Sequence, residues 1–102
     1  RQKDAFGLVN YALCLATGFQ VPADWESADE HMRLIGNEDA SQILSWWQSV
    51  AQDGDPEGDL VIAWLVRHGL IEDPDGLSRI ERLNRASTGK WTLPAWFWEE
   101  VE

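Results

Sequence analysis

The feature that most constrains the fold is an uninterrupted apolar stretch, Leu60 to Val66, in the second half of the chain. Asp55 and Pro56 stand before it as a favourable N-cap and first-turn pair, and Arg67 to Gly69 after it is typical of a helix C-terminus. A segment that is apolar on every side is either a central helix or a buried strand. We therefore predict a central helix around which the remaining elements pack.

Two helices are predicted in the N-terminal third. Apolar residues recur at helical spacing from Ala5 to Thr17, and a glycine follows as a stop signal. Ser27 and Glu30 match a capping box, which predicts a second helix over residues 28–35. Trp25 is then expected in the loop that precedes this helix.

A third helix is predicted from about residue 37 to residue 52, and a short aromatic helix over residues 95–101. Two interpretations of residues 77–93 stay open. The spacing of its apolar residues fits a helix, whereas residues 79–84 and 90–93 could instead pair as a β-hairpin. The expected fold is mainly α: a small single-domain bundle of four to five helices that spans the whole chain, with a short C-terminal hairpin of winged-helix type as the alternative.

The composition restricts the classes of possible binding partner more than it restricts the fold class. The 102 residues are 44% hydrophobic and 25% charged, which is ordinary for a globular protein, but a net charge of −10 and seven tryptophans are not. A negative surface repels nucleic acid and anionic membranes and attracts basic proteins. The single cysteine, Cys14, cannot form an internal disulfide, so we expect a reducing, cytoplasmic location.

The start of the chain only loosely imitates a secretion signal. Arg1 to Lys3 precedes an apolar stretch, but Asp4 and Asn10 interrupt the pattern, so we expect no signal peptide. No apolar run reaches the roughly 18 residues needed to cross a bilayer. The sequence begins with Arg1 rather than Met, which predicts a trimmed or processed chain and leaves a larger parent protein open.

Three partial motifs are weak, and none predicts a catalytic, cofactor or metal site. Residues 53–60 match part of an EF-hand loop, but the position that must supply a bidentate Glu is Trp64. Ser87 to Lys90 reads as S-x-x-K, yet a glycine inside it would break the helix that this nucleophile motif needs. The soft metal-ligand candidates lack the spacing of a zinc site: Cys14, His31 and His68.

Carboxylates gather where the predicted helices begin. The helix macrodipole stabilises each of them there by about 0.3–1 kcal/mol, which explains their placement but not their excess over the cations. Residues 1–60 contain only three cations, Arg1, Lys3 and Arg33. We interpret the surplus acids as part of a surface that binds a basic partner.

Tryptophan is the second surplus. Trp47 and Trp64 fall at core positions, whereas Trp46 is rotated by about 100° from Trp47 on the same helix. An exposed indole beside carboxylates suits a binding surface, because it offers a rigid anchor and attracts Lys or Arg. The predicted partner-binding residues are Trp25, Glu26, Asp29, Glu30, Trp46, Asp53, Asp55, Glu57, Trp91, Trp96 and Trp98. The alternative is that a small core simply uses large rings.

Cations gather in one stretch, which we call the basic corner: Arg79, Arg82, Arg85 and Lys90. Three interpretations stay open: a docking surface, a wing that touches a phosphate backbone, or an ordinary solvated helix face. Leu65 to Ile71 resembles the end of a recognition helix in winged-helix regulators. This resemblance implies that residues 79–93 form the wing.

Three functions stay in competition. The first is a non-enzymatic protein-binding module, an acidic inhibitor or adaptor that occupies a basic, nucleic-acid-binding surface of a partner protein. In charge and size it resembles the compact DNA-mimicking inhibitors of phages and mobile elements. The second is a winged-helix DNA-binding regulator that uses residues 59–94, and the third is a structural subunit of a larger assembly. An enzyme is not expected, because no glycine loop, metal cluster or paired carboxylate in a cleft is recognisable.

Overall fold

The computed structural model describes residues 5–99, and every regular element in this part of the chain is a helix. The elements are α1 (Ala5–Thr17), α2 (Trp25–Met32), α3 (Asn37–Gln52), α4 (Pro56–Arg67), α5 (Arg79–Ala86) and the 3-10 helix η1 (Ala95–Trp98). The radius of gyration is 12.5 Å, close to the roughly 13 Å expected for a folded domain of this length. The helices therefore form one body.

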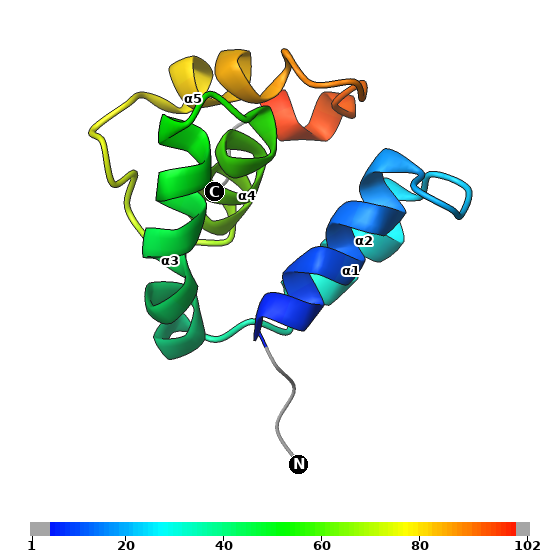
Figure 1. Cartoon of the computed structure of the whole chain (residues 1–102), viewed down its shortest axis with the longest axis horizontal. Coiled ribbons are helices and arrows are strands. Elements are labelled where there is room, and N and C mark those ends of the chain that lie inside the picture. Colours follow the sequence, from blue (N-terminus) through cyan, green and yellow to red (C-terminus); the bar gives the residue numbers. More distant parts are fainter. Residues whose placement is uncertain (1–4, 100–102) are drawn as a thin grey trace.

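Helix α4 is the central helix that its apolar sequence predicts. Asp55 caps it by accepting a hydrogen bond from the backbone N–H of Glu57, and Pro56 occupies its first position. Buried residues run without a break from Gly58 to Leu65. Helices α3 and α5 pack against α4, while the α1–α2 pair stands on the other side of it (Figure 1).

Helices α3 and α4 approach each other most tightly at Gly58. A Cβ atom at this position would overlap the backbone of Trp47 and Ala51. Glycine inside a helix costs about 0.5–1 kcal/mol relative to alanine. Here that cost is offset by the close packing of the two backbones.

The predicted bounds of α1 and α3 are confirmed. Gly18 follows α1 with a φ of 78°, the left-handed conformation expected of a helix stop. Helix α2 begins earlier than predicted, because the carboxylate of Asp24 accepts a hydrogen bond from the backbone N–H of Ser27 and so caps the helix. Trp25 is therefore the first residue of α2 and not a loop residue.

The β-hairpin alternative for the last third is wrong, since no strand occurs between residues 5 and 99. The helical alternative is confirmed as α5, which runs from Arg79 to Ala86. Ser78 and Glu81 cap α5 reciprocally, each side chain accepting from the backbone N–H of the other. This strong local signal explains why the segment is helical. The winged-helix alternative is therefore not supported, because the hairpin that would form the wing is absent from residues 5–99.

The C-terminal aromatic segment is shorter than predicted within the described residues. It forms the 3-10 helix η1, and Glu99 after it is extended. The rest of the expected helix, residues 100–101, lies outside the described residues, as does the start of the imitated secretion signal, residues 1–4.

Candidate functional site

Only one of the seven tryptophans is exposed: Trp46, whose exposed fraction is 58%. Trp47 and Trp64 are buried, as their positions predict. The exposure expected for the remaining four is wrong, because each is half-buried against the core: Trp25, Trp91, Trp96 and Trp98. Most of the indole surplus therefore completes a small core instead of forming an outer surface.

An aromatic cluster explains where three of these rings go. The ring centroids of Trp25 and Trp64 lie 5.6 Å apart, and those of Trp64 and Phe97 lie 5.2 Å apart. Trp96 stacks on Phe97 at 4.6 Å. Such pairs add roughly 0.5–1.5 kcal/mol beyond their buried area. The cluster thus connects three elements, because Trp25 belongs to α2, Trp64 to α4 and Phe97 to η1.

The outer face of α3 presents Trp46 between two carboxylates. Asp39 precedes it by seven residues and Asp53 follows it by seven, so all three lie on one side of the helix, about 10 Å apart along its axis. Asp53 is exposed and Asp39 is half-exposed. We call Asp39, Trp46 and Asp53 the α3 face.

The acidic turn after α3 extends this face. Asp55 is exposed, as predicted. Glu57 is half-buried, and burial together with the neighbouring Asp55 charge raises the pKa of its carboxyl. Among the predicted partner-binding residues, Trp46, Asp53 and Asp55 are therefore exposed on α3 and in the turn after it, while Glu26 and Glu30 are exposed on α2.

Asp29 does not face outward as predicted but sits in the seam between α2 and α4. Its carboxylate accepts hydrogen bonds from the indole N–H of Trp64 at 2.8 Å, from Nε2 of His68 at 2.8 Å and from Nε of Arg33 at 2.9 Å. Burial acts to raise the pKa of Asp29, but the bonds from Trp64 and His68 outweigh it and leave the pKa lowered. We call this group the Asp29 cluster.

His68 is the buried base of this cluster. Its side chain is only 7% exposed, and burial lowers its pKa below the ordinary 6.5 in spite of the Asp29 carboxylate. The neutral ring therefore donates from Nε2 to Asp29. Its Nδ1 atom is buried and has no hydrogen-bond partner among residues 5–99.

Arg82 takes no part in a basic corner, because it is buried inside a second cluster. Its guanidinium binds Asp73 through Nε and Nη2, Asp59 through Nη1 at 2.8 Å, and Asp75 through Nη2 at 2.9 Å. Burial acts to lower the pKa of Arg82, but the three carboxylates outweigh it and raise the pKa. We call these four residues the Arg82 cluster.

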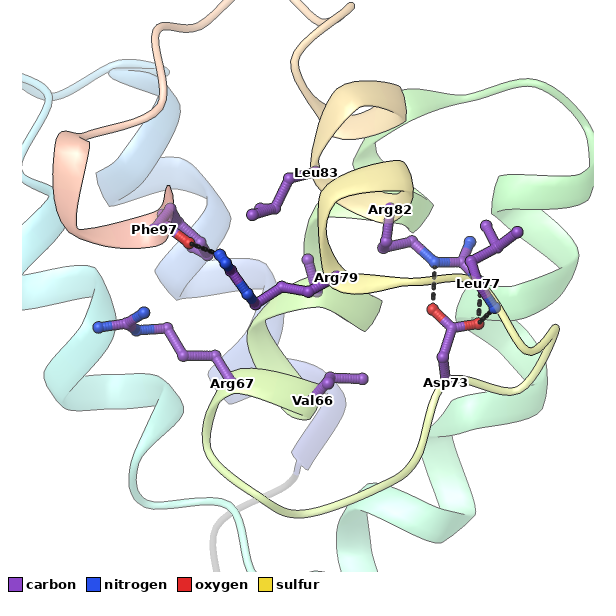
Figure 2. Close-up of a pocket in the computed structure, with 9 residues that line it drawn as sticks. Val66, Arg67, Asp73, Leu77, Arg79, Arg82, Leu83 and Phe97 are labelled. Atoms are coloured by element: carbon purple, nitrogen blue, oxygen red, sulfur yellow. Dashed lines mark hydrogen bonds and ion pairs between the residues drawn. The ribbon is translucent and has the colours of Figure 1, made fainter. Parts of the chain in front are cut away.

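The other members of the basic corner are dispersed. Arg79 and Arg82 point to opposite sides of a pocket under α5, Arg79 toward Phe97 and Arg82 toward Asp73 (Figure 2). Arg79 donates to the backbone carbonyl of Trp98 at 2.8 Å. The pocket measures about 30 Å³, room for a water molecule but not for an organic ligand. Arg85 and Lys90 are exposed.

The fold therefore withdraws cations from its surface. Among residues 5–99 the exposed cations are Arg33, Arg85 and Lys90. The exposed acids in the same range are Asp24, Glu26, Glu30, Glu38, Asp53, Asp55, Glu72, Asp75, Glu81 and Glu99. The outward surface is thus strongly acidic.

Two grooves that the sequence did not predict open beside the Asp29 cluster. One, of about 300 Å³, is lined by Arg33, Ile35, Arg67, His68 and Leu70. The other, of about 420 Å³, is lined by Glu26, Asp29, Glu30, Arg33, Arg67 and Trp96. Arg33 lies four residues after Asp29, a spacing that indicates an ion pair on one helix, but no sequence signal brings Arg67 to the same place.

Between residues 5 and 99, no group of three or more His, Cys, Asp or Glu side chains is arranged to hold a metal ion. No helix in that range has the length and apolarity to cross a bilayer. No protein-family model, curated protein or solved structure matches the chain.

Proposed function

We propose that this protein is a non-enzymatic protein-binding module whose acidic α3 face docks on a basic surface of a partner protein. A partner surface that ordinarily holds nucleic acid has the required charge, so the module would act as an inhibitor or an adaptor. The negative charge of the module would attract such a surface over a long range, and this attraction speeds association between oppositely charged proteins.

The observation that carries the proposal is the exposure of Trp46 on a surface depleted of cations. An indole that is 58% exposed is not needed to complete the core. The carboxylates of Asp39 and Asp53 flank it, and neither makes an ion pair with a cation among residues 5–99. Trp is enriched among the few residues that dominate binding energies, and its π face attracts Lys and Arg.

The distribution of charge favours a protein over a nucleic acid as the direct partner. Phosphate backbones need several cations on one face. Arg82, the centre of the predicted basic corner, is 2% exposed and bonded to three carboxylates. The surface near α3 would repel phosphates and attract basic side chains.

The test has two steps. Immobilised protein captures partners from a lysate after nuclease treatment, at low and at high salt, and the captured protein is then purified. Its affinity is measured for the unmodified chain, for Trp46→Ala and for Trp98→Ala, a matched change at a half-buried indole of η1. We expect Trp46→Ala to weaken binding at least tenfold, which is about 1.4 kcal/mol, and salt to weaken it further.

Two results would contradict the proposal. One is a partner that binds Trp46→Ala as tightly as the unmodified chain. The other is capture that depends on nucleic acid and disappears after nuclease treatment. A loss in Trp98→Ala that equals the loss in Trp46→Ala would place the contact elsewhere.

A second candidate function, a structural subunit of an assembly, is favoured by apolar side chains on the N-terminal helix pair. Tyr11 is 54% exposed, and Phe19 and Val21 in the loop between α1 and α2 are 62% and 42% exposed. Phe19 and Val21 are two residues apart in this loop, and exposed apolar groups that lie close together mark contact surfaces. Light scattering over a range of concentrations tests this candidate, because self-association through this surface would disappear in Phe19→Ser.

A further inference from the structure

The two grooves beside the Asp29 cluster share Arg33 and Arg67 as common walls. The remaining lining of the 300 Å³ groove is His68 and the apolar residues Ile35 and Leu70. The 420 Å³ groove continues to carboxylates, among them those of Glu26 and Glu30. The residues that line the pair therefore include apolar, cationic and anionic side chains.

Both arginines are held in place while most of their donors stay free. Arg33 uses Nε to bind Asp29, and Arg67 uses Nη1 to bind the backbone carbonyl of Glu99 at 3.2 Å. Arg67 is also stacked over the Trp96 ring at 5.1 Å. Their remaining guanidinium nitrogens make no hydrogen bond within residues 5–99. Fixed guanidinium groups with spare N–H donors are well suited to bind a carboxylate.

The charges around the grooves discriminate against simple ions. Glu26, Glu30 and Asp29 would repel a phosphate or another dianion, and the two arginines would repel a simple cation. A molecule that carries both charges a few ångströms apart satisfies both walls. An apolar portion of the same molecule would then pack on Ile35 and Leu70.

We propose that the paired grooves bind a free zwitterionic α-amino acid with an apolar side chain. Its carboxylate binds Arg33 and Arg67, its ammonium group faces Glu26 and Glu30, and its side chain contacts Ile35 and Leu70. This site lies at the seam of α2 and α4 and is separate from the α3 face, so it does not depend on the proposed partner binding.

The test compares three probes that differ by one charged group. These are L-leucine, 4-methylpentanoate, which lacks the ammonium group, and isopentylamine, which lacks the carboxylate. Binding is followed by NMR at the Nε–H groups of Arg33 and Arg67 and at the indole N–H of Trp96. We expect saturable shifts with leucine and a Kd on the order of 1 mM, with each of the other probes at least fivefold weaker.

Variants separate the two charged contacts. Arg67→Gln should abolish the leucine response, and Arg67→Lys, which keeps the charge but loses the planar donors, should weaken it severalfold. Glu30→Gln should weaken leucine binding without weakening that of 4-methylpentanoate. Arg85→Gln is the matched control, because it removes the same charge from an exposed arginine of α5 that does not line the grooves.

The proposal is overturned if leucine gives no saturable shift, or if 4-methylpentanoate binds as tightly as leucine. It is also overturned if Arg85→Gln lowers leucine binding as much as Arg67→Gln does. Thermal unfolding of each variant shows whether the fold is kept, and if Arg67→Gln fails to fold, the Glu30→Gln and Arg67→Lys comparisons decide.

Discussion

The Arg82 cluster and the Asp29 cluster are opposite in arrangement, since one has a cation at its centre and the other a carboxylate. In the first, one guanidinium is surrounded by the carboxylates of Asp59, Asp73 and Asp75. In the second, one carboxylate is surrounded by three donors from Trp64, His68 and Arg33. Both clusters fasten a neighbouring segment to α4.

The difference lies in what each cluster leaves unused. Every guanidinium nitrogen of Arg82 is bonded and its side chain is 2% exposed, so the cluster has nothing to offer a ligand. In the Asp29 cluster the acceptor is saturated, but the Arg33 side chain is 64% exposed and keeps free donors beside a groove. An arginine is structural or available according to the number of acceptors that surround it.

The largest expected effect is at the centre of the Arg82 cluster. Arg82→Leu leaves Asp59 buried without a cation, and removing one partner of a buried ion pair costs about 3–5 kcal/mol. Urea unfolding measures this loss. Arg85→Leu, the same change at an exposed site of α5, should alter the free energy of unfolding by less than about 0.5 kcal/mol. Equal effects of the two changes would show that Arg82 is not structural.

A smaller loss in the free energy of unfolding is expected from a substitution in the Asp29 cluster. Asp29→Ala deprives the indole N–H of Trp64 and the ring N–H of His68 of their acceptor, and unsatisfied buried donors destabilise by about 1–3 kcal/mol. Glu30→Ala, its exposed neighbour on α2, is the control and should have little effect. If Asp29→Ala were as harmful as Arg82→Leu, the contrast between the clusters would fail.

His68 should make stability depend on pH, with a modest effect. Because burial lowers its pKa in the folded protein below 6.5, the unfolded chain binds more protons just below that pH. The free energy of unfolding should therefore rise with pH through this window and level off above 6.5. Urea unfolding at a series of pH values measures the slope, which His68→Gln should remove and His31→Gln should keep. A slope that persists in His68→Gln would contradict the assignment.

The smallest effect on stability is expected on the α3 face. Trp46→Ala removes a ring that is 58% exposed, so the free energy of unfolding should fall by no more than about 0.5 kcal/mol. Thermal unfolding measures this change. Trp47→Ala, its buried neighbour, should cost about 3–5 kcal/mol. A large loss in Trp46→Ala would mean that the ring serves the fold and not a partner.

Local signals made much of this fold predictable. The apolar run of α4, its Asp55 cap and the helical spacing of α1 each act within one or two turns, so the sequence displays them directly. The start of α2 differs from the prediction because Asp24 and Ser27 are both good N-caps, and the sequence pattern alone does not choose between them.

The site was less predictable, because it depends on pairs that are distant in sequence. Trp64 and Asp29 are 35 residues apart, and Arg82 and Asp59 are 23 apart. No periodicity reveals such partners, so Asp29 was expected on the surface and Arg82 in a basic corner. Trp46 was identified because its rotation away from Trp47 is a property of one helix.

The most direct test of the proposed function is the salt dependence of affinity for the purified partner. The unmodified chain is compared with Asp39→Asn/Asp53→Asn on the α3 face and with Glu72→Gln/Glu99→Gln, two exposed acids elsewhere. We predict that the α3-face variant binds more weakly at low salt and loses part of the salt dependence, while the control keeps both. Identical affinity and salt dependence in all three proteins would contradict an electrostatic docking surface on α3.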